Sequence, residues 1–377
     1  MKLLYIAALP MDFANLDGVP KKIISQCKAL GTDFDVDLLY YFDGSVWLRT
    51  LKTGEIRKLG PGHSKLDVVR LAADLADRGG YGAMYIRYPK SDHLLLRLLK
   101  RAKQRGIRIA MEIPTYPYDM EGHETFRGRV VNSLDRMFRN WIHPYVDRIV
   151  TYSDDREIFG IPTINTINGV DFEAVAWDLS PVDVENRIDL IAVSAMFRVH
   201  GYDRLIRGLG EYYRAGGQRN VVLKLVGKGD AYDSYKALAE EYGIQDHVIF
   251  CGQRFGKDLD EVYRANALGI NSLAIHRQGL TKESTLKTKE YAAKGLPVLS
   301  SSWVDAFSAE GNERFALRIS PDETPVDVQA LIAFVDGIYR DRPIEEIRRE
   351  IREDGRKTCD VHRTMKCVAD FLLGKEA

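Results

Sequence analysis

Hydroxyl, amine and carboxylate side chains gather in one stretch, GLTKESTLKTKEYAAKGLPVLS, which spans residues 279–300. Its pattern predicts a loop, a short helix over 284–294, a turn and a buried strand. Ser284 or Thr285 is a candidate N-cap, because a side-chain hydroxyl can accept a hydrogen bond from an unpaired backbone N–H group. Gly295 suits the left-handed residue that ends a helix. Chemistry at this helix start is therefore the first hypothesis.

Two features of the predicted helix would suit a nucleoside diphosphate. Free N–H groups and the positive dipole end of a helix attract anions, and Lys282, Lys287 and Lys289 surround that end. Further along, Glu290 shares a face with Leu286, so we expect its carboxylate to face inward, where it needs a hydrogen-bonded partner. Phosphates would bind the helix start and ribose hydroxyls would bind Glu290. The alternative is an ordinary α/β helix with solvated lysines and a carboxylate capped by the backbone.

The motif TLKTKEYAAKGLPVL at 285–299 resembles the donor-site signature of the retaining glycosyltransferases of family 4, in its bacterial polysaccharide-biosynthesis form. Glu290 and the sequence GLPV at 295–298 match the second half of that signature. The first half departs from it, since Lys282 stands eight residues before Glu290 and Glu283 comes one place late. The resemblance implies that Glu283 takes the catalytic role of the first glutamate, through a local shift of the loop.

The resemblance also implies the donor-binding residues, most of which follow predicted strands: Gly18, Arg198, His200, Lys228, Arg254, Ser284, Thr285, Leu286, Lys287 and Glu290. Family members clamp the diphosphate with a Gly-Arg and a Lys-Gly pair, where this sequence has SA at 194–195 and HG at 200–201. Arg198 or His200 is the candidate replacement, because a guanidinium can bind phosphate in bidentate fashion.

Acceptor-side candidates follow the strand predicted over 107–113, since ligands bind beyond the carboxyl ends of strands in open α/β sheets. The loop EIPTYPYDME offers Thr115, Tyr116 and Asp119 for this role. The nearby His123 is interpreted as an ordinary solvated loop histidine, so no general base is assigned.

Composition excludes several classes of protein. The chain has 377 residues, with 54 Lys and Arg against 54 Asp and Glu, so no global field would attract nucleic acid. Four scattered cysteines lack metal-ligand spacing and indicate a reducing compartment. The apolar N-terminus is predicted to be a first strand and not a signal peptide, and no apolar run is long enough to cross a membrane. These observations predict a cytoplasmic protein.

Alternating strand and helix patterns predict two consecutive α/β units with parallel sheets. The first is expected over 1–171, rejoined by a terminal helix at about 358–377, and an acidic linker over 172–186 leads to the second over 187–357. With the resemblance, this organisation implies the GT-B fold: two Rossmann-like βα domains facing across a cleft, with the acceptor on the first and the nucleotide-sugar donor on the second.

A long helix predicted over 126–145 mixes four arginines with apolar and aromatic residues. One interpretation is a packed helix with its arginines facing solvent, which is the more common arrangement. The other is a helix that lies on a membrane surface, which would make the protein peripheral at the inner face of a membrane.

The residues and the resemblance together predict a glycosyltransferase of the hexosyltransferase type. It would move a sugar from a nucleotide-sugar donor, with a UDP-sugar as the first candidate, to a glycan or lipid-linked glycan acceptor with retention of configuration. The resemblance implies metal independence, and no cofactor is expected because the nucleotide sugar is a substrate. Two alternatives remain open, a nucleotide-sugar 2-epimerase of the same fold and a non-catalytic partner subunit of a glycosyltransferase. An NAD-dependent enzyme is disfavoured, since no Gly-x-Gly-x-x-Gly follows the first strand.

Overall fold

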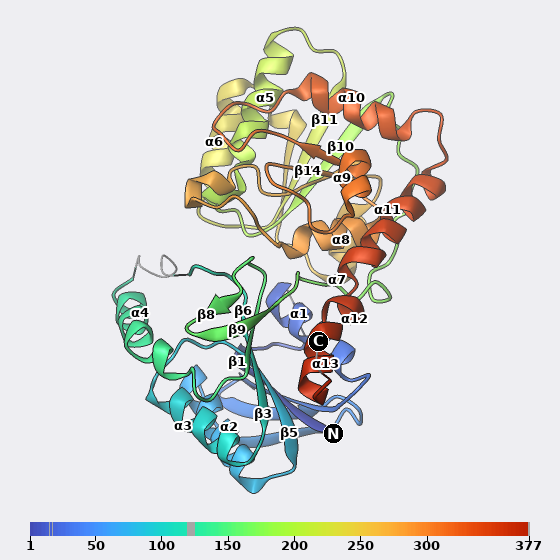
Figure 1. Cartoon of the computed structure of the whole chain (residues 1–377). Coiled ribbons are helices and arrows are strands. Elements are labelled where there is room, and N and C mark those ends of the chain that lie inside the picture. The colour runs from blue at the N-terminus through green and yellow to red at the C-terminus, as the bar shows by residue number, and fades with distance from the viewer. Residues whose placement is uncertain (15, 17, 119–124, 376–377) are drawn as a thin grey trace. The chain divides into compact units, whose positions relative to one another are not determined.

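The computed structural model describes residues 1–14, 16, 18–118 and 125–375. The chain divides into two compact units, one comprising Met1–Gly169 with Val361–Ala377 and the other Val170–Asp360 (Figure 1). The stretch expected as a linker, 172–186, belongs to the second unit.

A nine-stranded sheet forms the centre of the first unit, with the order β4-β3-β2-β1-β5-β6-β7-β9-β8. Its strands are β1 (Lys2–Pro10), β2 (Asp35–Phe42), β3 (Ser45–Thr50), β4 (Ile56–Pro61), β5 (Tyr81–Arg87), β6 (Arg108–Ile113), β7 (Arg148–Thr151), β8 (Glu157–Ile158) and β9 (Ile161–Asn165). Strands β2, β1, β5, β6, β7 and β9 run parallel, whereas β3 and β4 add antiparallel strands at one edge.

Helices cover both faces of this sheet. They are α1 (Gly18–Leu30), α2 (Lys65–Arg78), α3 (His93–Gln104), α4 (Phe126–Phe138), η1 (Arg139–Trp141), α12 (Val361–Thr364) and α13 (Lys366–Leu373). One core cluster joins the sheet to α2 and α3, which lie side by side in Figure 1, and a second joins its other face to α1, α12 and α13. The apolar runs of the sequence become strands because both faces of a parallel sheet are buried.

Six parallel strands form the sheet of the second unit, in the order β12-β11-β10-β13-β14-β15. The strands are β10 (Arg187–Val193), β11 (Asn220–Val226), β12 (Val248–Gly252), β13 (Leu268–Ile270), β14 (Val298–Ser300) and β15 (Ala316–Arg318). The helices are η2 (Arg198–His200), α5 (Tyr202–Arg214), α6 (Tyr232–Tyr242), η3 (Gln245–His247), α7 (Gly256–Tyr263), η4 (Ile275–Gln278), α8 (Leu286–Lys294), α9 (Ala309–Phe315), α10 (Val328–Tyr339) and α11 (Ile344–Cys359). The predicted α/β class is confirmed in both units.

The helix predicted over 284–294 is α8, and it ends as expected. Its C-cap residue Gly295 has a φ of 75°, in the left-handed region that favours glycine. A Cβ atom at this position would also approach the backbone oxygen of Arg348 to 2.7 Å. Backbone conformation and close packing therefore both require glycine here.

The helix predicted over 126–145 is α4 followed by η1. The prediction that its apolar residues pack against the protein, with only its arginines facing solvent, is wrong. The buried residues of α4 are Asn132 and Asp135, whereas Phe126, Met137 and Trp141 are exposed. Within the described parts of the chain, no helix is both long enough and apolar enough to span a bilayer.

Candidate active site

The strand order of the second unit reverses between β10 and β13, because β11 and β12 lie on one side of this pair and β14 and β15 on the other. In open α/β sheets, ligands bind outside the carboxyl ends of the strands at such a switch point. The loops after the two strands are held together there, since the Leu273 N–H group donates to the His200 oxygen at 2.8 Å. A Cβ atom at Gly201 would lie 2.6 Å from the Cβ atom of Ala274, so this close approach requires glycine.

Tyr291 of α8 joins the two central strands beneath this point. Its buried hydroxyl accepts a hydrogen bond from the Val193 N–H group at 3.1 Å and donates to the Ile270 oxygen at 3.2 Å. The ring packs over Gly269, where a Cβ atom would lie 2.5 Å from it. Helix α8 is therefore fixed with its first turn at the carboxyl edge of the sheet.

Glu283 and Lys287 flank the two polar residues that follow β13. The Asn271 side-chain amide donates to Glu283 Oε1 at 2.7 Å, and the Lys287 amine donates to Ser272 Oγ at 3.1 Å. The Thr285 hydroxyl in turn donates to Asn271 Oδ1 at 3.0 Å. A carboxylate and an amine are thus held in place at the switch point by the start of α8 and the end of β13.

Burial changes the acid–base properties of both charged groups. It raises the pKa of Glu283, and the positive charge of Lys287 acts in the opposite direction. Burial lowers the pKa of Lys287 to about 8, opposed by the charge of Glu283. Each group is therefore easier to neutralise than usual, and an anion beside Lys287 would favour its charged form.

His200 lies near this pair but does not supply a positive charge. Its burial, with a further effect from Lys287, lowers its pKa to about 2. The Phe197 N–H group donates to His200 Nδ1 at 3.3 Å, which leaves the ring proton on Nε2, and the ring stacks on Tyr202. The position expected to replace the diphosphate clamp therefore holds a neutral imidazole, with the Lys287 amine as the nearby cation.

The predicted capping of α8 by a hydroxyl is wrong. Thr285 is the N-cap residue, but its side chain makes no capping hydrogen bond. Ser284 Oγ instead donates to Asp305 at 2.5 Å and accepts from the Lys289 amine at 3.1 Å, and Lys289 also forms a buried ion pair with Asp305. Lys289 is therefore a structural residue and not part of an anion site, and the start of α8 lacks a side-chain cap from its N-cap residue.

Glu290 is half-buried, and the predicted inward stripe is only partly correct. Ala293 is buried, but Leu286 is half-buried as well, and the fully buried positions of α8 are Lys289, Tyr291, Ala292 and Ala293. Burial chiefly raises the pKa of Tyr291, and the charge of Glu290 adds to this shift, so the carboxylate lies near that ring. Glu290 therefore lies at the margin of the packed face.

The remaining donor candidates of the second unit are exposed: Arg198, Lys228 and Arg254. Lys228 lies on the same edge as the switch point, because its backbone oxygen accepts from the Met196 N–H group at 3.0 Å. At Gly227, a Cβ atom would approach the Ser194 oxygen to 2.0 Å, so glycine allows the two loops to touch.

The acceptor-side candidates belong to the first unit. Thr115 is exposed, whereas Tyr116 is half-buried, with its ring 6.1 Å from that of Phe159. Asp119 lies outside the described residues. Gly18, a donor candidate of the same unit, begins α1 and has open space around its Cα.

Glu112, in the same strand-end motif, is fully buried and is not available to an acceptor. The Lys22 amine and the Arg87 guanidinium donate to its Oε1 at 2.9 and 2.8 Å. The Gln26 amide and the Tyr85 hydroxyl donate to Oε2 at 2.8 and 2.7 Å. Burial alone would raise the pKa of Glu112, but the two cations outweigh it and lower the pKa to about 2. Glu112 therefore anchors α1 to the sheet.

Residues 180–358 match the family model of glycosyl transferases group 1. The structure is similar over 100% of both chains to sucrose-phosphate synthase from Thermosynechococcus elongatus, with a TM-score of 0.67 and 15% identity. It is similar over 100% of this chain and 99% of the other to a glycosyltransferase from Rickettsia africae, with a TM-score of 0.65 and 14% identity. No curated protein matches the chain by sequence.

The chain has the GT-B fold. Its two Rossmann-like α/β units match those of GT-B glycosyltransferases, as the resemblance implied. A third similar structure is HepE from Anabaena in complex with UDP, with a TM-score of 0.62, 15% identity and coverage of 99% and 100% of the two chains. The group 1 match covers nearly the whole second unit of this GT-B protein, where the switch-point residues lie.

Sequence reasoning missed Asn271 and Ser272 as the residues that hold Glu283 and Lys287. A signal was present, because two polar residues directly follow the apolar strand at 268–270. It also missed the Lys22 and Gln26 pair, whose four-residue spacing places both side chains on one face of a helix.

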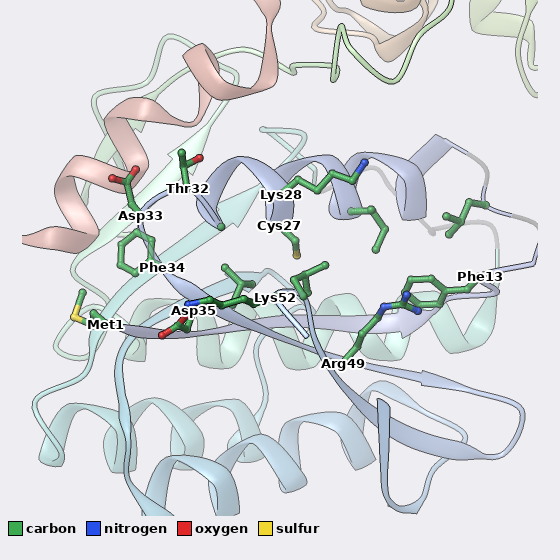
Figure 2. Close-up of a pocket in the computed structure, with 15 residues that line it drawn as sticks. Met1, Phe13, Cys27, Lys28, Thr32, Asp33, Phe34, Asp35, Arg49 and Lys52 are labelled. Carbon is green, nitrogen blue, oxygen red and sulfur yellow. Dashed lines mark hydrogen bonds and ion pairs between the residues drawn. The ribbon is translucent and has the colours of Figure 1, made fainter. Parts of the chain in front are cut away.

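A hollow of about 760 Å³ lies in the first unit of the GT-B fold, between α1, β2 and β3, and Figure 2 shows the residues that line it. Phe13 and Arg49 stack across one side of it, and Asp35 and Lys52 form an exposed ion pair at 3.1 Å. Among the residues that the structure describes, none that the sequence proposes for the site lines this hollow.

Proposed function

We propose that this protein is a glycosyltransferase that moves a sugar from a nucleotide-sugar donor to a glycan or lipid-linked glycan acceptor, with retention of configuration and without a required metal. One observation carries this proposal: the group 1 match falls on the unit whose switch point holds Glu283, Lys287 and the start of α8.

The start of α8 would bind the diphosphate of the donor. Leu286 is the first residue of the helix and Thr285 is its N-cap, and the Thr285 hydroxyl is committed to Asn271 instead of capping the first turn. Backbone N–H donors fixed in this way stabilise developing negative charge without reorganisation. The Lys287 amine would add its charge, and Glu290 at the margin of the helix would bind the ribose hydroxyls.

In the proposed reaction, the bond between the anomeric carbon and the diphosphate oxygen breaks, and the nucleoside diphosphate leaves with the electron pair. The acceptor hydroxyl forms the new bond on the same face of the sugar, and its proton passes to the leaving phosphate oxygen. Positive charge develops on the sugar ring as the old bond lengthens. Glu283, held by Asn271, would bind the sugar and stabilise that charge.

UDP-sugars are the first donors to test, because HepE from Anabaena, a structure of similar fold, has been solved with UDP and with UDP-glucose. We expect the purified protein to release UDP from UDP-glucose or another UDP-sugar when a glycan acceptor is present, with and without EDTA. NMR of the product should show the anomeric configuration of the donor. Inversion at C2 of UDP-N-acetylglucosamine without acceptor would instead identify an epimerase. Absence of nucleotide binding in calorimetry would indicate a non-catalytic subunit.

Lys287 predicts a pH dependence of donor binding. Since its pKa in the free protein is lowered to about 8, the amine is charged below that pH and neutral above it. We expect the UDP dissociation constant to rise above pH 8, by up to about tenfold per unit, until the pH reaches the higher pKa that Lys287 has in the complex. Lys287→Met should bind UDP more weakly at pH 7 and lose this dependence, whereas the exposed Lys257→Met should retain it. An unchanged profile in Lys287→Met would contradict the assignment.

A further inference from the structure

Helix α4 and η1 of the first unit present a row of large apolar side chains to solvent. Its members are between 42% and 76% exposed: Phe126, Val130, Leu134, Met137 and Trp141. They are separated by four, four, three and four positions, so they lie on one face of the helix. A continuous exposed apolar row of this kind is characteristic of an interaction surface. We call it the α4 apolar row.

Buried polar contacts fix the direction of this row. On the opposite face, Asp135 accepts hydrogen bonds from the Ser91 N–H group at 2.6 Å and from the Tyr118 hydroxyl at 2.7 Å. Asn132 accepts from the Lys90 amine. Rotating the helix to bury the apolar row would move Asp135 and Asn132 out to solvent. Their former hydrogen-bond donors would then remain in the protein without partners, which is costly. The outward direction of the α4 apolar row is therefore part of the fold.

Positive charge flanks the row on both sides. At about 100° per residue, Arg127 lies at one border of the row, and Arg129 and Arg136 lie at the other. All three are exposed. The single carboxylate in residues 125–145 of the sequence is Asp135, which is buried on the opposite face.

A basic hollow of about 620 Å³ adjoins the end of the row at Trp141. Arg97 and Lys100 from α3 line it, together with the imidazoles of His93 and His143, and no carboxylate of the described residues lines it. An apolar row that ends at a hollow lined by cations matches the two layers of a lipid surface, acyl chains and anionic headgroups.

We propose that α4 and η1 dock the protein on an anionic lipid surface. The α4 apolar row enters the boundary between headgroups and acyl chains, while the flanking arginines and the basic hollow bind lipid phosphates. The 13-residue α4 is only about 20 Å long, so it lies in the plane of the membrane and does not cross it. A symmetric contact with a second copy is disfavoured, because it would bring the arginines of the two copies together. The inference does not depend on the proposed function, since every residue it uses belongs to the first unit.

The test is sedimentation of the full chain with lipid vesicles. We expect strong binding to phosphatidylcholine vesicles containing about 40 mol % phosphatidylglycerol, weak binding to pure phosphatidylcholine, and loss of binding at about 0.5 M NaCl. Met137→Ser and Trp141→Ser should each lower the partition coefficient roughly tenfold. Arg127→Gln and Arg129→Gln should each lower it about fivefold.

Ile56→Ser is the matched control, because Ile56 is an apolar residue of the same unit that is 47% exposed on β4 and lies outside the row. It should bind vesicles as the unchanged protein does. Equal binding to both vesicle compositions, or equal loss of binding in Ile56→Ser, would overturn the proposal. So would a stable dimer that dissociates on Met137→Ser or Trp141→Ser, because the row would then be an interface between copies.

Discussion

Replacing Glu283 with glutamine is expected to lower turnover by about 10²–10⁴-fold, with a much smaller effect on the UDP dissociation constant. Glutamine keeps an oxygen that can accept from the Asn271 amide at the position now 2.7 Å away, so the loop should retain its conformation. The substitution removes the negative charge beside the sugar. Single-turnover kinetics with a UDP-sugar donor, together with calorimetry of UDP binding, separates the two effects.

Two further substitutions show whether this loss is specific. Glu290→Gln should chiefly raise KM for the donor, because Glu290 is assigned to the ribose. Glu313→Gln, on the exposed side of α9, should change neither constant. Full turnover in Glu283→Gln would refute the catalytic assignment while leaving the proposed diphosphate site untouched.

Glu112→Gln is expected to destabilise the first unit by about 3–5 kcal/mol, because it leaves the buried Lys22 and the half-buried Arg87 without their common carboxylate. The midpoint of the urea transition in which the first unit unfolds measures this change. The control is Asp35→Asn, which removes the exposed partner of Lys52. It should leave the midpoint of that transition nearly unchanged, since exposed ion pairs contribute little. Equal effects of the two substitutions would contradict the role of the buried cluster.

The same cluster predicts how stability changes with acid. The pKa of Glu112 falls from 4.5 to about 2 on folding, so its stabilisation is fully present above the unfolded value. It is lost as the pH falls from about 4.5 to about 2, and the lowered pKa corresponds to about 3 kcal/mol. In Glu112→Gln, the acid-induced loss of stability over this range should be smaller by that amount.

Local pattern determined most of the elements of this protein. Helices α3 (His93–Gln104) and α5 (Tyr202–Arg214) each have a regular apolar face and a polar face, which is a local pattern that favours a helix. Gly295 was correctly assigned to a helix end, since the left-handed backbone conformation is a local property. The motif at 285–299 also indicated the second unit, on which the group 1 match falls. A single short segment was enough for this, because the resemblance lies within one helix and the strand that follows it.

Side-chain partners could not be predicted in the same way. The ion pair between Lys22 and Glu112 joins residues 90 positions apart, and no local pattern specifies such a contact. The prediction that Lys289 belongs to an anion site was wrong for the same reason. Its partner Asp305 comes from the chain beyond the next strand.

The sequence by itself determined the α/β class, the order of the strands and helices, and the segment where chemistry is expected, because periodicity and turn residues act over a few positions. Only the tertiary structure decided which charged residues of α8 face the switch point and which face of α4 is buried. The physical reason is that a polar group is buried wherever distant parts of the chain supply its hydrogen bonds, as Ser91 and Tyr118 do for Asp135.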